Sequence, residues 1–187
     1  MQLLDLLTIN EELKNKEDLI EIVWTALDYF PQGTWEGINY LGNMNIRCDL
    51  KIKSKGEVYK AFIFNDLIAQ IRKIKKTLKI ADLLLALTHD PVITVCHRLE
   101  LERFKRTINV INDFVSRDVG IVSLYKMDEE VSIKVAAHGL GHNQGLEHHA
   151  EPVDLMYAAL LDGYPIRREG FCNDCQRKLR NSVLSNL

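Results

Sequence analysis

Long hydrophobic runs and an excess of charge of either sign are both absent from this sequence of 187 residues. No apolar stretch approaches the roughly 20 residues that are needed to cross a bilayer. The formal net charge of -2 gives no general attraction to nucleic acid or to an anionic membrane. The first residues, MQLLDLLTINEELKNK, lack the basic start and the small-residue cleavage site of a signal peptide. We therefore expect a cytoplasmic monomer of one domain, with neither nucleic acid nor membrane as a partner.

Cysteine is also scarce, with four residues in the chain. A chain of this size without an export signal is not expected to depend on a disulfide framework. Cys48 and Cys96 lie among apolar residues with strand-like patterns, so we interpret both as small core residues. Cys172 and Cys175 form a CxxC between polar residues, where burial explains little. These two cysteines need another role.

The hydrophobic pattern alternates between helical and strand-like segments. It predicts helices over residues 17–30, 66–79, 98–116 and 131–144. It predicts strands over residues 43–53, 57–64, 81–88, 91–97 and 119–125, with Pro91 placing the fourth of these at a sheet edge. The continuous apolar run over 81–88 is typical of a strand that is covered on both faces. Helices that alternate with buried strands indicate a layered α/β sheet.

Histidine is concentrated in one stretch, HGLGHNQGLEHH, which runs from His138 to His149. His138 and His142 lie four residues apart, so both face the same side of the predicted helix and can bind one ion. Gly145 then allows the chain to leave the helix in a left-handed turn, which can bring His148 round as a third ligand. Three histidines leave one tetrahedral position open for water, which is the arrangement of a catalytic zinc.

This stretch resembles the metzincin zinc signature HExxHxxGxxH, which is followed by a methionine turn. It resembles more narrowly the signature of the archaemetzincins, in which four further cysteines hold a second, structural zinc. In that family one cysteine follows the third histidine at once, another comes five positions later, and a CxxC completes the set. In HGLGHNQGLEHHAEPVDLM and the later CNDC, the corresponding positions are His149, Asp154, Cys172 and Cys175, and Met156 stands at the turn methionine.

The resemblance implies an α/β fold of the metzincin or zincin type. It would have a mixed twisted sheet with packing helices, a zinc-binding active-site helix and a small C-terminal segment stapled by zinc. Residues 1–187 would form a single domain, with an N-terminal α/β subdomain (1–144) and a C-terminal subdomain (145–187) that carries the methionine turn and the CxxC.

The resemblance also implies two zinc ions. Imidazole and carboxylate are both competent zinc ligands, so the His149 and Asp154 replacements preserve a chemically acceptable second site. The alternative is that the second zinc is lost and the CxxC is a relic or a redox pair. The two expected ligand sets are His138, His142 and His148 for a catalytic-type zinc, and His149, Asp154, Cys172 and Cys175 for a structural zinc.

Gly139 occupies the position of the family's catalytic glutamate. That carboxylate takes a proton from water and passes it to the leaving amine, and glycine can do neither. Glycine also costs a helix about 1 kcal/mol relative to alanine, so helix formation does not favour it here. The other candidate groups nearby are Glu147, Glu151, Tyr125 and Tyr157, and none of them is a convincing base.

Three functions follow from these observations. The first is a zinc-binding, archaemetzincin-like pseudoenzyme with little or no peptidase activity, because the general base is absent. The second is an active metallohydrolase with a displaced base or with substrate-assisted chemistry. The third is a non-catalytic module that binds peptides or a protein partner on a zincin scaffold. Peptides or proteins are the expected partners in all three cases.

Overall fold

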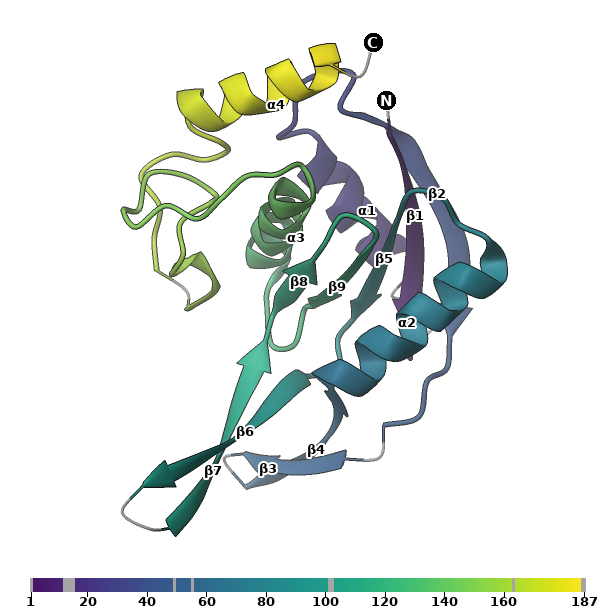
Figure 1. Cartoon of the computed structure of the whole chain (residues 1–187), viewed down its shortest axis with the longest axis vertical. Coiled ribbons are helices and arrows are strands. Elements are labelled where there is room, and N and C mark those ends of the chain that lie inside the picture. Colours follow the sequence, from purple (N-terminus) through teal and green to yellow (C-terminus); the bar gives the residue numbers. More distant parts are fainter. Residues whose placement is uncertain are drawn as a thin grey trace.

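A five-stranded mixed sheet forms the centre of the molecule (Figure 1). The computed structural model describes residues 2–11, 16–48, 50–54, 56–100, 103–162 and 164–185. The strand order is β2-β1-β5-β9-β8, in which all neighbours are parallel except β9 and β8. The bounds of these strands are Trp35–Met44 for β2, Gln2–Ile9 for β1, Leu83–Thr88 for β5, Val119–Ser123 for β9 and Asp113–Val115 for β8.

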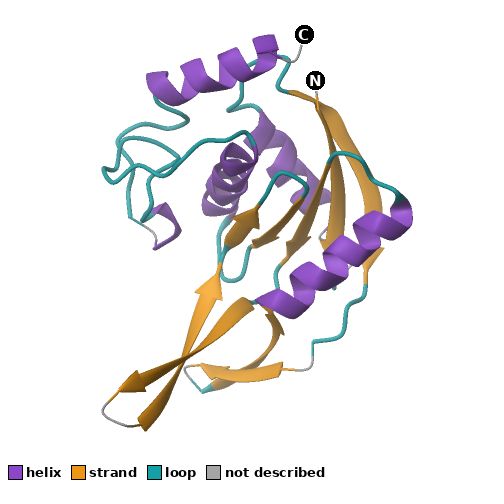
Figure 2. Cartoon of the chain, viewed as in Figure 1, coloured by secondary structure: helices purple, strands orange, loops and turns teal. Residues whose placement is uncertain are grey.

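Helices cover both faces of this sheet (Figure 2). α1 (Lys16–Leu27) and α3 (Glu129–Asn143) pack on one face, and α2 (Phe64–Leu78) packs on the other. Side chains alternate along β5, so Leu83 and Leu85 contribute to the first core cluster and Leu84 to the second. This double coverage explains why the strand is apolar at almost every position, as the sequence predicted. Within the described part of the chain, every helix is too short or too polar to cross a lipid bilayer.

The mixed α/β architecture with packing helices is the one that the sequence predicted. The expected helices over 17–30, 66–79 and 131–144 are confirmed within a few residues by α1, α2 and α3. The expected strands over 81–88 and 119–125 are confirmed by β5 and β9. The strand expected over 43–53 is partly wrong, because residues 45–48 separate β2 from the next strand. Cys48 lies in this connection, outside the strands, and its side chain is half-buried.

The helix predicted over residues 98–116 is wrong. This stretch forms the end of β6 (Val92–Glu100), then β7 (Arg103–Ile111) and β8, while residues 101 and 102 lie outside the described part. Apolar residues spaced three and four apart misled the prediction. The β-branched residues Thr107, Ile108, Val110 and Ile111 favour a strand instead.

β6 and β7 belong to a second, four-stranded sheet of order β3-β4-β6-β7, with β3 at Leu50–Ser54 and β4 at Glu57–Ile63. Figure 1 shows the β6–β7 hairpin extending from the body of the molecule. The start of β6 pairs with β4 as well as with β7, so its predicted place at a sheet edge is also wrong. Cys96 in this strand is exposed and is not a core residue.

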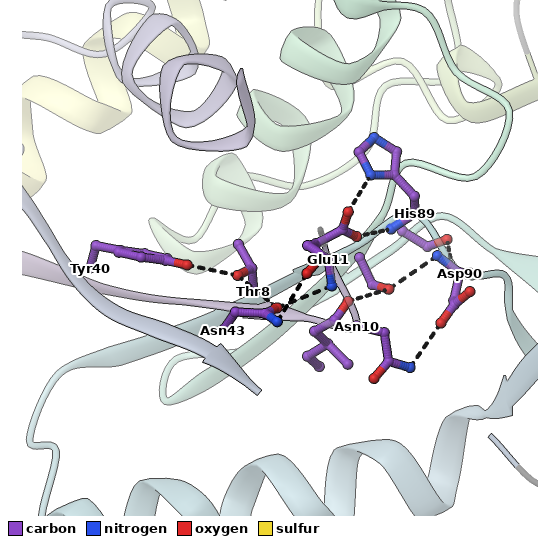
Figure 3. Close-up of polar contacts among 10 residues, drawn as sticks. Thr8, Asn10, Glu11, Tyr40, Asn43, His89 and Asp90 are labelled. Carbon is purple, nitrogen blue, oxygen red and sulfur yellow. Dashed lines mark hydrogen bonds and ion pairs between the residues drawn. The ribbon is translucent and has the colours of Figure 1, made fainter. Parts of the chain in front are cut away.

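Polar side chains tie together the carboxyl ends of β1, β2 and β5 (Figure 3). Glu11 accepts a hydrogen bond from the backbone nitrogen of His89 at 2.7 Å and pairs with its Nδ1 at 2.9 Å. Asn10 Nδ2 donates to Asp90 Oδ2 at 2.9 Å. The hydrogen bond with Glu11 raises the pKa of His89, although burial opposes this effect. These contacts fix the ends of the parallel strands relative to one another.

The C-terminal stretch shares the core cluster on the α1 and α3 face. It contains a short 3-10 helix (Leu160–Asp162) and α4 (Asn173–Ser185). Phe171, buried just before α4, packs edge-on against Phe30 with ring centroids 5.0 Å apart. Cys175 and Leu179 on α4 belong to the same cluster as the buried residues of α1 and α3. The described residues from 145 onward are therefore packed onto the N-terminal part through a common hydrophobic core.

Candidate metal centres and active site

α3 carries the first two histidines, and its ends are well defined. Asp128 caps the helix by accepting a hydrogen bond from the backbone nitrogen of Val131 at 2.9 Å. After α3 ends, Gly145 adopts a φ of 81°, the left-handed turn that the sequence predicted. The backbone nitrogen of Leu146 returns to the carbonyl of Gly141 at 3.0 Å. This turn sends the chain back so that His148 approaches the helix.

The three histidines point their Nε2 atoms at one spot. The Nε2 atom of His138 lies 3.1 Å from those of both His142 and His148, and the last two are 2.9 Å apart. Nδ1 of His138 lies 2.6 Å from the carbonyl of Leu155, and Nδ1 of His142 lies 3.0 Å from that of Leu146. A carbonyl only accepts hydrogen bonds, so in both rings Nδ1 carries the hydrogen and Nε2 presents a lone pair.

Converging lone pairs repel one another unless they share a cation. Nitrogens bound to a tetrahedral zinc at about 2.0–2.1 Å would lie roughly 3.3 Å apart, which is close to the observed separations. Backbone carbonyls that hold the outer ring nitrogens are also typical of metal-binding histidines. The three histidines therefore fit a zinc ion in geometry, and His138 and His142 fit it in protonation as well.

Burial prepares the same rings for metal binding. It lowers the pKa of His138, which is fully buried, and that of His142, and the neighbouring histidines lower both further. Hydrogen bonds to the backbone carbonyls partly oppose these shifts. A lowered pKa favours neutral imidazole, which is the form that binds a metal.

The predicted turn methionine packs against the helix that carries two of the three histidines. Met156 is fully buried, and its Sδ would lie 2.7 Å from a Cβ atom at Gly141. Glycine therefore allows α3 to lie directly against this methionine. The preceding residue, Leu155, holds His138 through its carbonyl. The turn thus supports one of the ligands and the helix that carries two of them.

A second cluster contains the other predicted ligands. His149 Nε2 lies 3.2 Å from Cys175 Sγ, 3.7 Å from Cys172 Sγ and 3.5 Å from Asp154 Oδ2. One ligand atom from each of these four residues lies within 4.8 Å of all the others. The structure therefore brings His149, Asp154, Cys172 and Cys175 together, with two sulfurs, one nitrogen and one oxygen available for a tetrahedral ion.

Asp154 is the organising residue of this second cluster. Its carboxylate is fully buried and accepts hydrogen bonds from the backbone nitrogens of Met156 at 2.9 Å and Cys172 at 2.8 Å. Burial alone would raise the pKa of Asp154, but its hydrogen bonds to Cys172 and Met156 lower it overall. Burial and the adjacent Asp154 charge raise the pKa of the Cys175 thiol. A cation bound among these groups would favour the thiolate.

Both clusters are held by the same short segments. His148 belongs to the first cluster and His149 to the second. The backbone nitrogen of His149 donates to the carbonyl of Met156 at 2.7 Å, and the chain pairs here in a short bridge to Tyr157. Asp154, in the second cluster, is followed at once by Leu155, which positions His138. The two clusters therefore share the backbone segments that position their ligands.

A carboxylate that the sequence did not single out lies beside the three histidines. Asp113 on β8 has a side chain that is 6% exposed, and its Oδ2 lies 3.9 Å from His138 Nε2. This oxygen is buried and has no hydrogen-bond partner among the described residues. Burial raises the pKa of Asp113 to about 6, although His142 and His148 oppose the shift. Sequence reasoning missed Asp113 because it predicted a helix over residues 98–116. A strand, in which side chains alternate between two faces, would have placed Asp113 and Val115 on the same face.

Gly139 faces β8 and not empty space. A Cβ atom at this residue would lie 2.8 Å from Val115 Cγ2 and 3.2 Å from Asp113 Oδ2. The first distance is shorter than real side chains tolerate, so something would have to shift. Glycine at 139 is therefore explained by the close approach of α3 and β8, despite its cost to the helix.

The other acid–base candidates are placed less well. Glu147 and Glu151 are exposed. The ring of Tyr125 packs edge-on against Tyr59 with centroids 5.3 Å apart. Tyr157 packs against the main core cluster. Compared with these carboxyl and phenol groups, Asp113 alone combines burial with a free oxygen directed at the histidines.

The helix with two histidines one turn apart, the third histidine after a glycine turn and the buried methionine against the helix resemble a zincin-type site that lacks the helical glutamate. The fold is archaemetzincin-like. The chain is similar to an archaemetzincin from Methanopyrus kandleri, with a TM-score of 0.57 and 17% identity, over 98% of this chain and 96% of that one. It is also similar to a zinc-dependent peptidase from Methanocorpusculum labreanum, with a TM-score of 0.54 and 16% identity, over 94% of this chain and 99% of that one.

A third solved structure, metalloproteinase-II from Bacteroides fragilis, matches with a TM-score of 0.50 and 14% identity. The match covers 97% of this chain and 53% of that one. No protein-family model matches the sequence, and the comparison with curated proteins also gives no match. At these identities the similarity establishes the fold, and the chemistry of the site has to be argued from its own residues.

Proposed function

We propose that this protein is a zinc-dependent hydrolase of peptide bonds, with His138, His142 and His148 as the zinc ligands. The observation that carries the proposal is the convergence of three Nε2 atoms within 3.1 Å of one another. Zinc held by these residues would supply Lewis acidity toward a carbonyl oxygen and a water molecule. Two of the structural neighbours, an archaemetzincin and a zinc-dependent peptidase, support the same class of reaction.

A second zinc is part of the proposal. His149, Asp154, Cys172 and Cys175 would hold it, and its role is structural because all four positions are filled by protein side chains. This ion would fix the segment from His149 to Met156 and thereby the orientation of His138. The alternative of a relic or redox CxxC is less favoured, since the CxxC sulfurs face an imidazole and a carboxylate.

An extended peptide is the substrate class that we propose. β8 ends the five-stranded sheet, pairs with β9 on one side only within the described residues, and packs against α3 close to the histidines. The free side of such a strand can pair with an added extended peptide through backbone hydrogen bonds. This arrangement would hold a scissile bond near the three histidines.

The sequence alone favours little or no activity, because Gly139 supplies no carboxylate. Asp113 changes this preference, since its buried carboxylate lies next to Gly139 and His138, in the space that a side chain at position 139 would enter. We therefore favour the second alternative, an active hydrolase with a displaced base, over a pseudoenzyme or a binding module. We still expect the protein to be a monomer and to act in the cytoplasm.

The test is cleavage of unstructured peptides by the zinc-loaded protein, the protein treated with a chelator, and the His138→Ala/His142→Ala variant. We expect cleavage that needs both zinc and the two histidines. Peptides that bind without being cut would favour the binding module. A protein that neither cuts nor binds peptides under any zinc concentration would refute the proposal.

A further inference from the structure

The carboxylate that α3 lacks is present on the neighbouring strand β8. We propose that Asp113 is the general base of this site and that Gly139 is the residue that makes room for it. The proposal deepens the zinc hydrolase function and rests on it. It assigns the role of the missing helical glutamate to a residue from another element of the fold.

The first support is position. Asp113 and Val115 alternate along β8 on the face that packs against α3, whereas Phe114 belongs to the cluster on the other face of the sheet. A Cβ atom at Gly139 would lie 3.2 Å from Asp113 Oδ2. The carboxylate of Asp113 thus lies in the space that a side chain at 139 would enter. One position on the helix and one on the strand compete for the same volume, and here the strand residue fills it.

The second support is an unexplained cost. A buried carboxylate oxygen without a hydrogen-bond partner destabilises a folded protein, and natural structures hold few such groups without a reason. Within the described part of the chain Asp113 Oδ2 is such an atom, and it lies 3.9 Å from His138 Nε2. Pairing of β8 with β9 does not need this oxygen, because the two strands pair through their backbones. The water molecule that takes part in hydrolysis would donate a hydrogen bond to this oxygen.

The third support separates a base from a fourth metal ligand. Ligands of one tetrahedral zinc lie roughly 3.3 Å apart when the bonds are about 2.0–2.1 Å long. Asp113 Oδ2 is further than this from His138 Nε2, at 3.9 Å. Within the described residues, the cluster whose ligand atoms all lie within 4.8 Å of one another contains the three histidines and not Asp113. Asp113 therefore lies just outside the ligands, where a proton acceptor belongs.

The step that Asp113 performs is a proton relay. Oδ2 accepts a proton from water while the water oxygen forms a bond to the carbonyl carbon of the peptide. The carbon–nitrogen bond of the peptide then breaks, and Oδ2 returns the proton to the leaving nitrogen. Water and a peptide become a carboxylic acid and an amine, and Asp113 ends as it began.

The experiment compares Asp113→Asn with Glu147→Gln in the full-length, zinc-loaded protein. Both changes remove one carboxylate near a ligand, but Glu147 is exposed beside His148 in the sequence. Three quantities are measured: peptide cleavage, zinc affinity by competition with a chelator, and affinity for a peptide hydroxamate. A hydroxamate binds the metal and also donates a hydrogen bond to a carboxylate beside it, so its affinity reports on Asp113 even without turnover.

We expect Asp113→Asn to lower kcat by about 10²-fold or more with little change in KM. Its hydroxamate affinity should fall about 10-fold or more, and its zinc affinity should stay within a few-fold of the parent. Glu147→Gln should match the parent in all three measurements. A triple variant, Asp113→Ala/Val115→Ala/Gly139→Glu, returns the carboxylate to the helix. It should regain hydroxamate affinity relative to Asp113→Ala/Val115→Ala.

Each other outcome has a distinct meaning. Full cleavage by Asp113→Asn overturns the role of Asp113 and leaves the hydrolase function intact. A fall in zinc affinity of about 10³-fold or more, beyond the roughly 10–100-fold that a group just outside the ligands typically contributes, would make Asp113 a ligand and also overturns the proposal. An inactive parent whose hydroxamate affinity depends on Asp113 refutes the peptidase function. Asp113 would then accept a hydrogen bond beside the metal without acting as a general base, so the proposal is overturned with it. Equal hydroxamate affinity in all variants overturns the proposal whatever the activity. If Asp113→Asn does not fold, the two variants that carry Val115→Ala give the same answer.

Discussion

Substitution of Gly139 by alanine tests the contact between α3 and β8 on which the active-site argument depends. The new Cβ would lie 2.8 Å from Val115 Cγ2, well inside normal contact distance. Overpacking of this kind typically costs about 1–3 kcal/mol. Alanine is the better helix former by about 1 kcal/mol, so the net loss of unfolding free energy is about 0–2 kcal/mol.

Val115→Ala removes the atom that clashes. In that background, Gly139→Ala should stabilise the protein by up to about 1 kcal/mol, the helix gain less the smaller cost of the remaining contact with Asp113 Oδ2 at 3.2 Å. The two substitutions should therefore couple by about 1–3 kcal/mol. Phe114→Ala is the matched control, because Phe114 is the adjacent residue of β8 and packs on the opposite face against Phe64 at 5.0 Å.

The assay is chemical denaturation of the four proteins in each double-mutant cycle, with metal removed so that zinc affinity does not enter. For a chain of this length, 1 kcal/mol corresponds to roughly 2–4 °C in Tm, which provides a second readout. Additive effects of Gly139→Ala and Val115→Ala would refute the reasoning. So would a Gly139→Ala protein that is more stable than the parent by the full helix gain.

Three further predictions follow from the structure. Cys172→Ser/Cys175→Ser should lose about one zinc per chain and increase hydrogen exchange around residues 149–185, and unchanged zinc content would show that this cluster holds no ion. His138→Ala/His142→Ala/His148→Ala should lose a different zinc while far-UV circular dichroism keeps the native fold; retention of both ions would disprove the three-histidine site. His89→Gln should destabilise the protein more at pH 5.5 than at pH 8, as thermal melting would detect. Glu11, with smaller effects from Asp90 and Asp18, raises the pKa of His89 in the folded protein. The stability that His89 contributes is therefore present below its pKa in the unfolded chain and is lost as the pH rises through its pKa in the folded protein. An equal loss of stability at both pH values would contradict this.

Local sequence patterns predicted the structure correctly where a single physical requirement, such as burial on both faces or the helical repeat, determined the residues. β5 is apolar along its length because helices cover both of its faces. His138 and His142 share a face because the helix repeats every 3.6 residues, and Gly145 has the φ that its turn requires. These features depend on residues close in sequence, so the sequence predicted them.

Patterns failed where helical and strand-like spacing coincide or where contacts come from distant segments. Residues 103–111 satisfy both periods, and pairing with β6 decides in favour of a strand. Asp113 and Gly139 are far apart in the chain, and their competition for one space depends on how β8 packs on α3. The sequence therefore identified the candidate metal ligands but not the carboxylate beside them.

Anomalous diffraction at the zinc absorption edge, from crystals grown with zinc, would locate the metal directly. We expect one peak among the Nε2 atoms of His138, His142 and His148, with Asp113 outside the ligands and its Oδ2 hydrogen-bonded to a water molecule. No peak among these histidines at saturating zinc, or a zinc bound directly by Asp113, would contradict it.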